Sequence, residues 1–303
     1  MKRWFCAIFT HLFFVSAIFA VDWPLEGAVM TSNFGKSDMG HPMLGDSFRA
    51  EGVINTIENG ELIFRRGVKS SSSRFTSPLG FMTALDHGDG LISIYSRAEA
   101  LQSPPQKQFI VSTPVAAAGT SGWTKTKGFY LSIFDRKDRR WVNPSLVIPV
   151  RPDTRPPAIR SVRLKSRDNQ MIDLAASRTI RQGAYTIIVH TEDTVLNDSD
   201  PPLMPMRIIC SVNGVEASVL AFETFSARDG VLMLFRNGLV PASQIYAYAP
   251  AVEAGEVFFN RGQVTLEIIV QDIAALSSPG ASSGGTSNGA SNSRSAVYRL
   301  FVE

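Results

Sequence analysis

Apolar and polar residues alternate in short segments along residues 21–150, and Gly, Pro, Asn and Ser separate these segments. Alternation with a period of two predicts strands that are buried on one face. No long segment repeats apolar residues every three to four positions, so little helix is expected. The predicted strands of this part are residues 52–57, 61–64, 81–85, 91–95 and 129–134.

A tight turn is predicted at His87-Gly88-Asp89-Gly90, between two of these strands. Gly and Asp tolerate the positive φ that a short hairpin loop requires. The segment therefore predicts a β-hairpin of residues 81–95.

The same alternation continues in residues 158–303, where Asn213-Gly214 is a strong type I′ hairpin signal. About seven short strands with such turns favour a β-sandwich of immunoglobulin-like type, although the cysteine pair of a true immunoglobulin domain is missing. The sequence thus predicts an all-β protein. The predicted strands are residues 158–164, 184–191, 206–212, 215–222, 231–235, 264–270 and 297–302.

Two breaks in the pattern divide the chain. Residues 151–157 contain three prolines, which block ladder hydrogen bonds and stiffen the backbone, so they are interpreted as a linker between domains 21–150 and 158–303. Residues 277–295 are almost wholly Ser, Gly, Ala and Asn and bury too little apolar area to offset the entropy of ordering. They are interpreted as a flexible surface insertion.

The N-terminus has the pattern of an export signal. Two basic residues at positions 2–3 precede an apolar run that ends at Ala20, which predicts a signal peptide of residues 1–20. The mature chain would then be exported to the periplasm or cell envelope without a membrane span. Cleavage leaves Cys210 as the only cysteine, so no internal disulfide is expected and Cys210 is interpreted as a small buried hydrophobe.

Charge indicates no nucleic-acid partner. The formal net charge of the whole chain is +3, and the predicted signal peptide carries two of these positive charges. Nucleic-acid binding requires a concentrated basic face, which these totals do not indicate.

Short motifs follow one another in a fixed order along residues 21–150. Together they cover nearly all of this region. They are Ser32-Asn33-Phe34-Gly35, Asn59-Gly60-Glu61-Leu62-Ile63-Phe64, the segment from Leu85 through His87 and Tyr95 to Arg97, Gly119-Thr120-Ser121-Gly122, Gly128-Phe129-Tyr130-Leu131-Ser132-Ile133-Phe134-Asp135 and Val142-Asn143-Pro144.

In order and spacing these motifs resemble the lysostaphin or LytM type of zinc endopeptidase, which cleaves peptidoglycan cross-bridges. The resemblance implies a lysostaphin-type antiparallel sheet domain. Its chemistry needs a zinc ion with three protein ligands and an open position for water. In the family these ligands are an H-x-x-x-D pair and the second His of H-x-H, and a Y-x-H motif supplies a catalytic His.

By this resemblance the zinc ligands and the catalytic His are absent. The H-x-H positions fall on Tyr130 and Ser132, and a hydroxyl is a poor substitute for imidazole on zinc. The catalytic His of Y-x-H, which begins here at Tyr95, falls on Arg97, whose guanidinium stays protonated and cannot accept a proton. His87 matches a family His and is interpreted as a residue packed in its hairpin.

The H-x-x-x-D pair is also missing, whichever of two ways this chain is aligned with the family motif. His41 is followed four residues later by Gly45, and Asp46 stands one position too far. If Gly45 is aligned with the central Gly of the family, the ligand positions fall on Met43 and Ser47. We therefore predict neither bound metal nor cofactor and no catalytic residue. The predicted former cleft consists of His41, Asp46, His87, Tyr95, Arg97, Tyr130 and Ser132.

Three functions remain open from the sequence. The leading hypothesis is a non-catalytic envelope protein whose inactive lysostaphin-type domain binds peptidoglycan or an envelope partner such as a cell-wall hydrolase. In this hypothesis the bound hydrolase is regulated by the domain. The second is an active zinc metallopeptidase with atypical ligands drawn from His41, Asp46 and His87. The third is a structural envelope or surface protein. Metal content and binding to peptidoglycan discriminate among them.

Two charged segments are also candidates for binding. Residues 191–202 contain Glu192, Asp193, Asn197, Asp198 and Asp200, oxygen ligands of the type that calcium prefers, but they lack the EF-hand pattern and are interpreted as a solvated loop. Arg136-Lys137-Asp138-Arg139-Arg140, with Lys125 and Lys127, forms a basic cluster that is interpreted as a soluble hairpin tip.

Overall fold

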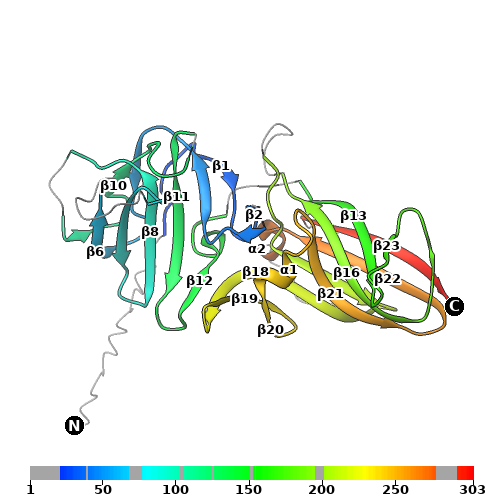
Figure 1. The fold of residues 1–303 in the computed structure, drawn as a ribbon. Coiled ribbons are helices and arrows are strands. Elements are labelled where there is room, and N and C mark those ends of the chain that lie inside the picture. Colours follow the sequence, from blue (N-terminus) through cyan, green and yellow to red (C-terminus); the bar gives the residue numbers. More distant parts are fainter. Residues whose placement is uncertain are drawn as a thin grey trace, which may run out of the picture.

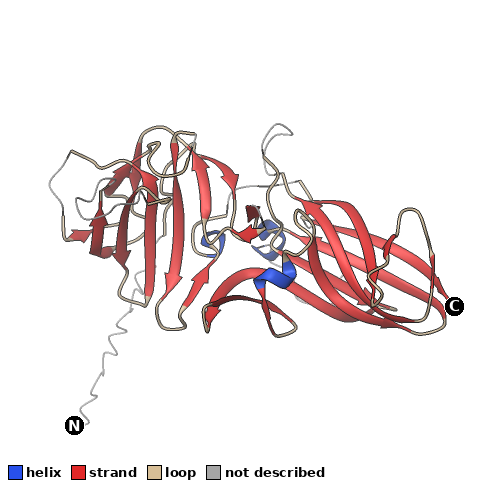
Figure 2. Cartoon of the chain, viewed as in Figure 1, coloured by secondary structure: helices blue, strands red, loops and turns tan. Residues whose placement is uncertain are grey.

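The all-β prediction is confirmed by the computed structural model. The structure describes residues 21–38, 40–67, 77–102, 106–124, 126–150, 153, 155–194, 201–277 and 292–303, so the predicted signal peptide and Lys125 lie outside it. Within these ranges the regular structure is almost entirely strand (Figure 2). The helices found there are the 3-10 helix η1 (Pro144–Leu146), α1 (Ala242–Ile245) and α2 (Ile273–Ser277). No helix of the described residues has the length and apolar character needed to cross a bilayer.

The N-terminal half, residues 21–150, is built on antiparallel strands in the order β12-β11-β8-β7-β6-β9, and β4 pairs with both β11 and β1. Strand β11 is central, because β8 pairs along one edge while β4 and β12 share the other. The strands are β1 (Val29–Ser32), β2 (Ser37–Asp38), β3 (His41–Pro42), β4 (Asp46–Arg49), β5 (Val53–Asn55), β6 (Gly60–Arg66), β7 (Phe81–Asp86), β8 (Leu91–Ala98), β9 (Gln108–Phe109), β10 (Pro114–Ala117), β11 (Gly128–Asp135) and β12 (Arg140–Val142).

The core of the N-terminal half follows from the alternation along β11. Phe129, Leu131 and Ile133 are buried on one face of the strand, as the period of two requires. The rings of Phe48 and Phe129 stack with centroids 4.8 Å apart. Burying each such side chain contributes roughly 1.5–3 kcal/mol, so these alternate positions hold the sheet against its covering loops.

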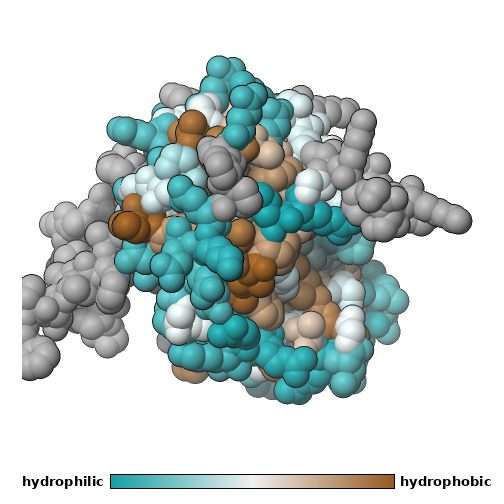
Figure 3. All heavy atoms as spheres, turned by 90° about the vertical axis from the view of Figure 1, so that its left-hand side faces the viewer, coloured by the Kyte–Doolittle hydropathy of each residue, from teal (hydrophilic) through white to brown (hydrophobic). Residues whose placement is uncertain are grey.

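The far edge of this half exposes apolar surface. Figure 3 views the molecule from the end that carries β6, and apolar areas lie there between hydrophilic ones. The exposed apolar side chains of β5 and β6 are Val53, Ile63 and Phe64.

The C-terminal half, residues 155–303, is a β-sandwich. One sheet has the order β14-β13-β16-β21, and the facing layer is β15-β23-β22-β17-β18 with β19 and β20 beyond it. Buried side chains from both layers form one core. The strands are β13 (Ala158–Ser166), β14 (Met171–Asp173), β15 (Thr179–Ile180), β16 (Gly183–Glu192), β17 (Arg207–Val212), β18 (Val215–Arg228), β19 (Val231–Arg236), β20 (Leu239–Pro241), β21 (Val252–Phe259), β22 (Gly262–Gln271) and β23 (Ser293–Val302).

One expected boundary in this half needs correction. Strand β23 begins at Ser293, so the last three residues of the insertion predicted at 277–295 belong to a strand. They pair with the end of β22, where Gln271 lies opposite Ser293. Residues 278–291 lie outside the described part of the chain.

The two halves share one sheet. Strand β12 pairs antiparallel with β18, with Trp141 opposite Phe225, so hydrogen bonding continues from one half into the other (Figure 1). Asn143 extends this junction, because its backbone N–H donates to the Glu223 carbonyl at 2.9 Å and its side-chain Nδ2 donates to the Phe222 carbonyl at 2.9 Å. The connection between the halves is therefore not confined to residues 151–157.

A segment of the N-terminal half also enters the C-terminal core. Phe34 is fully buried there, with its ring centroid 5.1 Å from that of Phe225. Gly35 follows with a φ of +80°, and a Cβ at this position would lie 2.7 Å from the Phe222 ring. Only glycine meets both conditions, so the S-x-F-G motif here packs the N-terminal half onto the sandwich.

Candidate functional site

Tyr130 and Ser132 occupy the same face of β11, two residues apart, on the face opposite the N-terminal core. Both are almost fully buried, at 6% and 5% exposure. The Arg97 guanidinium, from the end of β8, lies 5.0 Å from the Tyr130 ring centroid and makes a cation–π contact. The structure thus brings together the three residues that stand at the motif positions of the family's H-x-H and Y-x-H.

The Tyr130 hydroxyl is held in its neutral form. Burial raises its pKa to about 12, while hydrogen bonds from Ser132 and from the Leu44 backbone and the charge of Arg97 act in the opposite direction. The nearby charge of Asp46 adds to the rise. At neutral pH the phenol is therefore neither a base nor an anionic metal ligand.

The chain preceding β4 lies directly against the β11 positions. A Cβ on Gly45 would lie 2.3 Å from the Leu131 carbonyl oxygen and 2.6 Å from the Ser132 Oγ. The backbone at Gly45 thus lies directly against the Ser132 side chain and leaves little room on that side of it. Glycine at position 45 allows this close approach, which no residue with a Cβ permits.

Asp46 is fully buried at the start of β4. Its Oδ1 accepts a hydrogen bond from the Phe34 backbone N–H at 2.8 Å, and its Oδ2 accepts one from the Ser145 hydroxyl at 3.3 Å. Burial raises the pKa of Asp46 to about 7, although both hydrogen bonds lower it. Both oxygens therefore tie the turn at Phe34 and helix η1 to the sheet.

The remaining predicted cleft residues serve other contacts. His41 is exposed on β3, in a two-stranded ladder with β2. His87 lies in the β7–β8 turn, with Nδ1 2.7 Å from the Asn59 carbonyl oxygen and Nε2 2.8 Å from the Ser93 hydroxyl. Tyr95 is a core residue whose hydroxyl accepts from the Ile57 N–H at 2.9 Å. Burial raises the pKa of Tyr95 to about 12.

Of the seven predicted residues, contacts join Arg97, Tyr130 and Ser132, and Asp46 lies near enough for its charge to act on Tyr130. We call these four the central cluster. Among the described residues, the only group of three or more His, Cys, Asp or Glu whose ligand atoms lie within 4.8 Å of one another is Asp153, Asp193 and Asp272. His41, Asp46 and His87 therefore do not converge as the atypical zinc site would require.

The basic cluster of the β11–β12 hairpin is balanced by acidic neighbours. Arg136 pairs with Asp86 at 2.8 Å, and Arg140 pairs with Asp138 at 2.8 Å and with Asp135 at 3.3 Å. The arginine side chains are exposed although Asp86 and Asp135 are not, so solvent still screens the pairs. The arrangement fits the interpretation of a soluble hairpin tip.

Comparison with known proteins finds partial likenesses. No curated protein matches the sequence. A protein-family model that carries no functional description matches residues 156–278. Among solved structures, a mutant catalytic domain of the prophage-encoded M23 protein EnpA from Enterococcus faecalis is 18% identical with a TM-score of 0.32, and the match covers 38% of this chain and 87% of that one.

Two further solved structures show likenesses of similar extent. A zinc-containing peptidase from Vibrio cholerae is 16% identical, with a TM-score of 0.34 and coverage of 41% of this chain and 38% of its own. The catalytic domain of lysostaphin from Staphylococcus simulans is 12% identical, with a TM-score of 0.29 and coverage of 36% and 78%. Each likeness spans less than half of this chain, so the case for function rests on the residues of the chain itself.

Proposed function

We propose that this chain is a non-catalytic protein of the cell envelope whose N-terminal half is an inactive lysostaphin-type module. In this proposal the module binds peptidoglycan, or an envelope partner such as a cell-wall hydrolase whose activity it regulates. The proposal rests on one observation. At the expected ligand and catalytic positions, Arg97 contacts the Tyr130 ring, Tyr130 is hydrogen-bonded to Ser132, and the backbone at Gly45 lies against Ser132.

The chemistry of the central cluster supports inactivity. Activating water needs a Lewis acid or a base whose pKa lies near the working pH. Arg97 cannot accept a proton, and the pKa of Tyr130 is raised to about 12. Ser132 offers a weakly ligating hydroxyl. Asp46 has a pKa raised to about 7, but it is fully buried and its oxygens accept from Phe34 and Ser145, so it does not face a water in solvent. None of the four is equipped to generate hydroxide.

Peptidoglycan is the ligand to test first, because the sequence motifs resemble those of peptidases that cleave it. Purified residues 21–303 would be incubated with insoluble sacculi and sedimented, with and without an excess of free muropeptides as competitor. Retention on sacculi with release by muropeptides is the expected result. A protein that stays wholly in the supernatant would favour the structural hypothesis instead.

The catalytic alternative has its own measurement. Elemental analysis of the same preparation is expected to give no stoichiometric zinc, and muropeptides are expected to remain uncleaved with or without added zinc. About one equivalent of zinc together with cleavage that a chelator abolishes would replace the proposal by the metallopeptidase hypothesis.

A further inference from the structure

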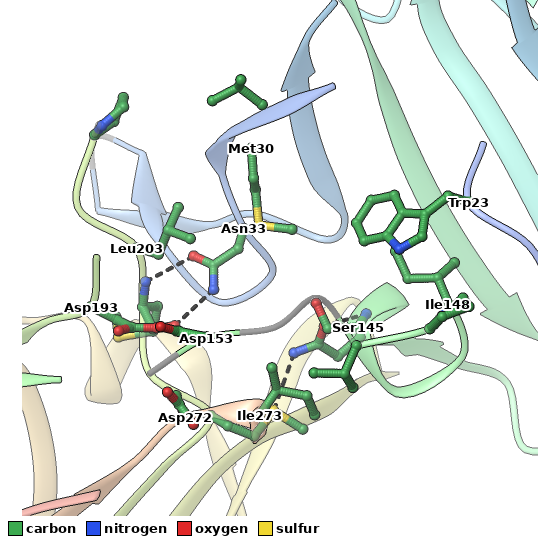
Figure 4. A pocket seen from close by; sticks show the side chains of 17 residues that line it. Trp23, Met30, Asn33, Ser145, Ile148, Asp153, Asp193, Leu203, Asp272 and Ile273 are labelled. Atoms are coloured by element: carbon green, nitrogen blue, oxygen red, sulfur yellow. Dashed lines mark hydrogen bonds between the residues drawn. The ribbon is translucent and has the colours of Figure 1, made fainter. Parts of the chain in front are cut away.

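A pocket of about 90 Å³ lies where the two halves meet (Figure 4). Met30 and Asn33 line it from the N-terminal half, Ser145 lines it from η1, and Leu203 lines it from the C-terminal half. Asn33 also joins the halves directly, because its Oδ1 accepts from the Met204 N–H at 2.8 Å and its Nδ2 donates to the Met204 carbonyl at 2.7 Å. The pocket is therefore a fixed part of the junction.

Three carboxylates gather on one side of this pocket. Asp153 comes from the predicted linker, Asp193 follows β16 and Asp272 immediately precedes α2, and one oxygen of each lies within 4.8 Å of the others. Figure 4 shows Asp153 and Asp193 beside each other and Asp272 below them, and all three line the pocket. Asp153 and Asp272, which are 119 positions apart in the sequence, are thus close neighbours in the fold.

The backbone around each carboxylate is held in place. Asp193 exchanges two backbone hydrogen bonds with Leu203, at 2.9 and 2.7 Å. The Asp272 N–H donates to the Asn292 carbonyl at 3.2 Å, and the Asn292 side-chain Nδ2 donates to the Asp153 carbonyl at 2.7 Å. The positions of the three side chains are accordingly set by the fold.

Two oxygens of this cluster are buried without a partner. Asp193 and Asp272 are only 6% and 2% exposed, yet Asp193 Oδ1 and Asp272 Oδ2 accept no hydrogen bond in the described structure. No Lys or Arg among the described residues forms an ion pair with any of the three carboxylates. Other oxygens of the cluster are partnered, because Asp272 Oδ1 accepts from the Ala275 N–H and Asp153 Oδ1 accepts from the Arg155 N–H, both at 2.9 Å. Two buried carboxylate oxygens without a hydrogen bond or a countercharge are nevertheless costly, so this cluster is incomplete as it stands.

The pKa values of these carboxyl groups also indicate that the cluster lacks a positive charge. Burial, together with the neighbouring charges of Asp272 and Asp153, raises the pKa of Asp193 to about 7. Burial likewise raises the pKa of Asp272 to about 6. A cation placed among the three oxygens would reverse both effects.

We propose that Asp153, Asp193 and Asp272 bind one calcium ion at the junction between the two halves. The donor set consists of hard carboxylate oxygens, and no His or Cys joins the group in the described residues. Calcium accepts irregular coordination by carboxylates, carbonyls and water, whereas magnesium requires strict octahedral geometry and retains most of its water. The bound ion would fasten the linker, the end of β16 and the start of α2 together.

The burial of Asp193 corrects the interpretation of the acidic segment 191–202. Residues 191–202 were expected to be a solvated loop, and for Asp193 this is wrong because Asp193 is buried. Glu192 belongs to a different environment, since it pairs with Arg160 at 2.6 Å. Residues 195–200, with Asn197, Asp198 and Asp200, lie outside the described part of the chain.

Calcium titration of the chelator-stripped protein tests this inference independently of the proposed function. Isothermal titration of residues 21–303 with calcium chloride at pH 7.5 is expected to give one site, with a Kd on the order of 10⁻⁴ M as in extracellular calcium modules. Saturating calcium should raise Tm, and magnesium at equal concentration should raise it less.

Variants decide whether the three carboxylates are the ligands. Asp193→Asn and Asp272→Asn should each weaken calcium binding at least about tenfold, while Glu192→Gln, next to the site but paired with Arg160, should bind as the parent does. Near-ultraviolet circular dichroism in chelator checks that each variant is folded, and Asp153→Asn replaces any that is not. Absence of calcium binding by the parent, or unchanged binding by folded Asp193→Asn, would overturn the proposal.

Discussion

The Tyr246 hydroxyl donates a hydrogen bond to the backbone carbonyl of Gly35, although 211 positions separate the two residues. Tyr246 is buried directly after α1 in the C-terminal core, and Gly35 belongs to the motif that precedes β2. The bond fixes the turn that carries Phe34 into the sandwich. A segment that by resemblance belongs to a peptidase domain is thus a structural part of the second core.

Phe34→Ala is expected to destabilise the whole protein. The side chain is fully buried in the C-terminal core, and truncating such a phenylalanine costs about 3–5 kcal/mol. Urea denaturation measures the loss as a lower midpoint. Phe64→Ala, on the exposed face of β6, is the matched control and should cost less than about 1 kcal/mol. Equal losses for the two variants would show that Phe34 is not packed as described.

The stability of the protein should fall as Asp46 ionises. The folded-state pKa of Asp46 is raised to about 7, above its value in the unfolded chain. The stabilisation from the protonated form is therefore complete below about pH 4, decreases between pH 4 and 7, and is lost above pH 7. Its full extent is on the order of 3–4 kcal/mol.

Asp46→Asn tests this pH dependence. The amide is isosteric with the protonated carboxyl and retains partners for Phe34 and Ser145. The variant should therefore show a smaller decline in unfolding free energy between pH 4.5 and 8 than the parent, and the share that Asp193 and Asp272 contribute should remain. Asp135→Asn is a control of opposite sign, because desolvation raises the pKa of Asp135 but is outweighed by hydrogen bonds from the Asp138 and Lys137 backbone and by Arg140, so that the net pKa is lowered. Parallel pH profiles for Asp46→Asn and the parent would rule out the assigned pKa.

Ser132→His should not restore a zinc site. An imidazole needs more room than a hydroxyl, and the backbone at Gly45 already approaches the Ser132 Oγ. Overpacking of this kind costs about 1–3 kcal/mol. Thermal unfolding with and without zinc should show a lower Tm and no shift on zinc addition, whereas exposed Thr126→His should leave Tm nearly unchanged. Stoichiometric zinc on Ser132→His would mean that the space next to β11 is open.

Cys210 should be unreactive in the native protein. It is fully buried on β17, and burial raises its pKa to about 12, so thiolate is scarce at pH 8. Ellman's reagent should label the chain without residues 1–20 slowly in buffer and completely in guanidinium. Rapid labelling in buffer would contradict the placement of Cys210 in the core.

Local patterns predicted the strands well where the residues themselves favour strand. Asn213-Gly214 joins β17 to β18 with both residues at positive φ, as the hairpin signal required, and β11 matches its predicted segment within a residue at each end. Strand β21 was missed because Val252-Glu253-Ala254-Gly255-Glu256 is rich in poor strand formers. It forms because β16 supplies a partner along its length.

The sites were harder to predict because they depend on distant contacts. The resemblance indicated that Arg97, Tyr130 and Ser132 belong together, and the structure places them in contact. Nothing in a local window links Asp153 with Asp272, which meet only after β16, β22 and the linker have been arranged. Sequence patterns specify which face of a strand is buried, but they do not specify which loops meet.

The pairing of β12 with β18 has a mechanical consequence. A hinge between two domains needs a flexible connection with few crossing bonds, and here a hydrogen-bonded ladder and the inserted Phe34 cross the boundary instead. Twisting one half relative to the other would break several bonds at once. The chain should therefore behave as a stiff spacer. A ligand bound at the β6 end would stay at a constant distance and angle from a partner bound at the C-terminal strand β23.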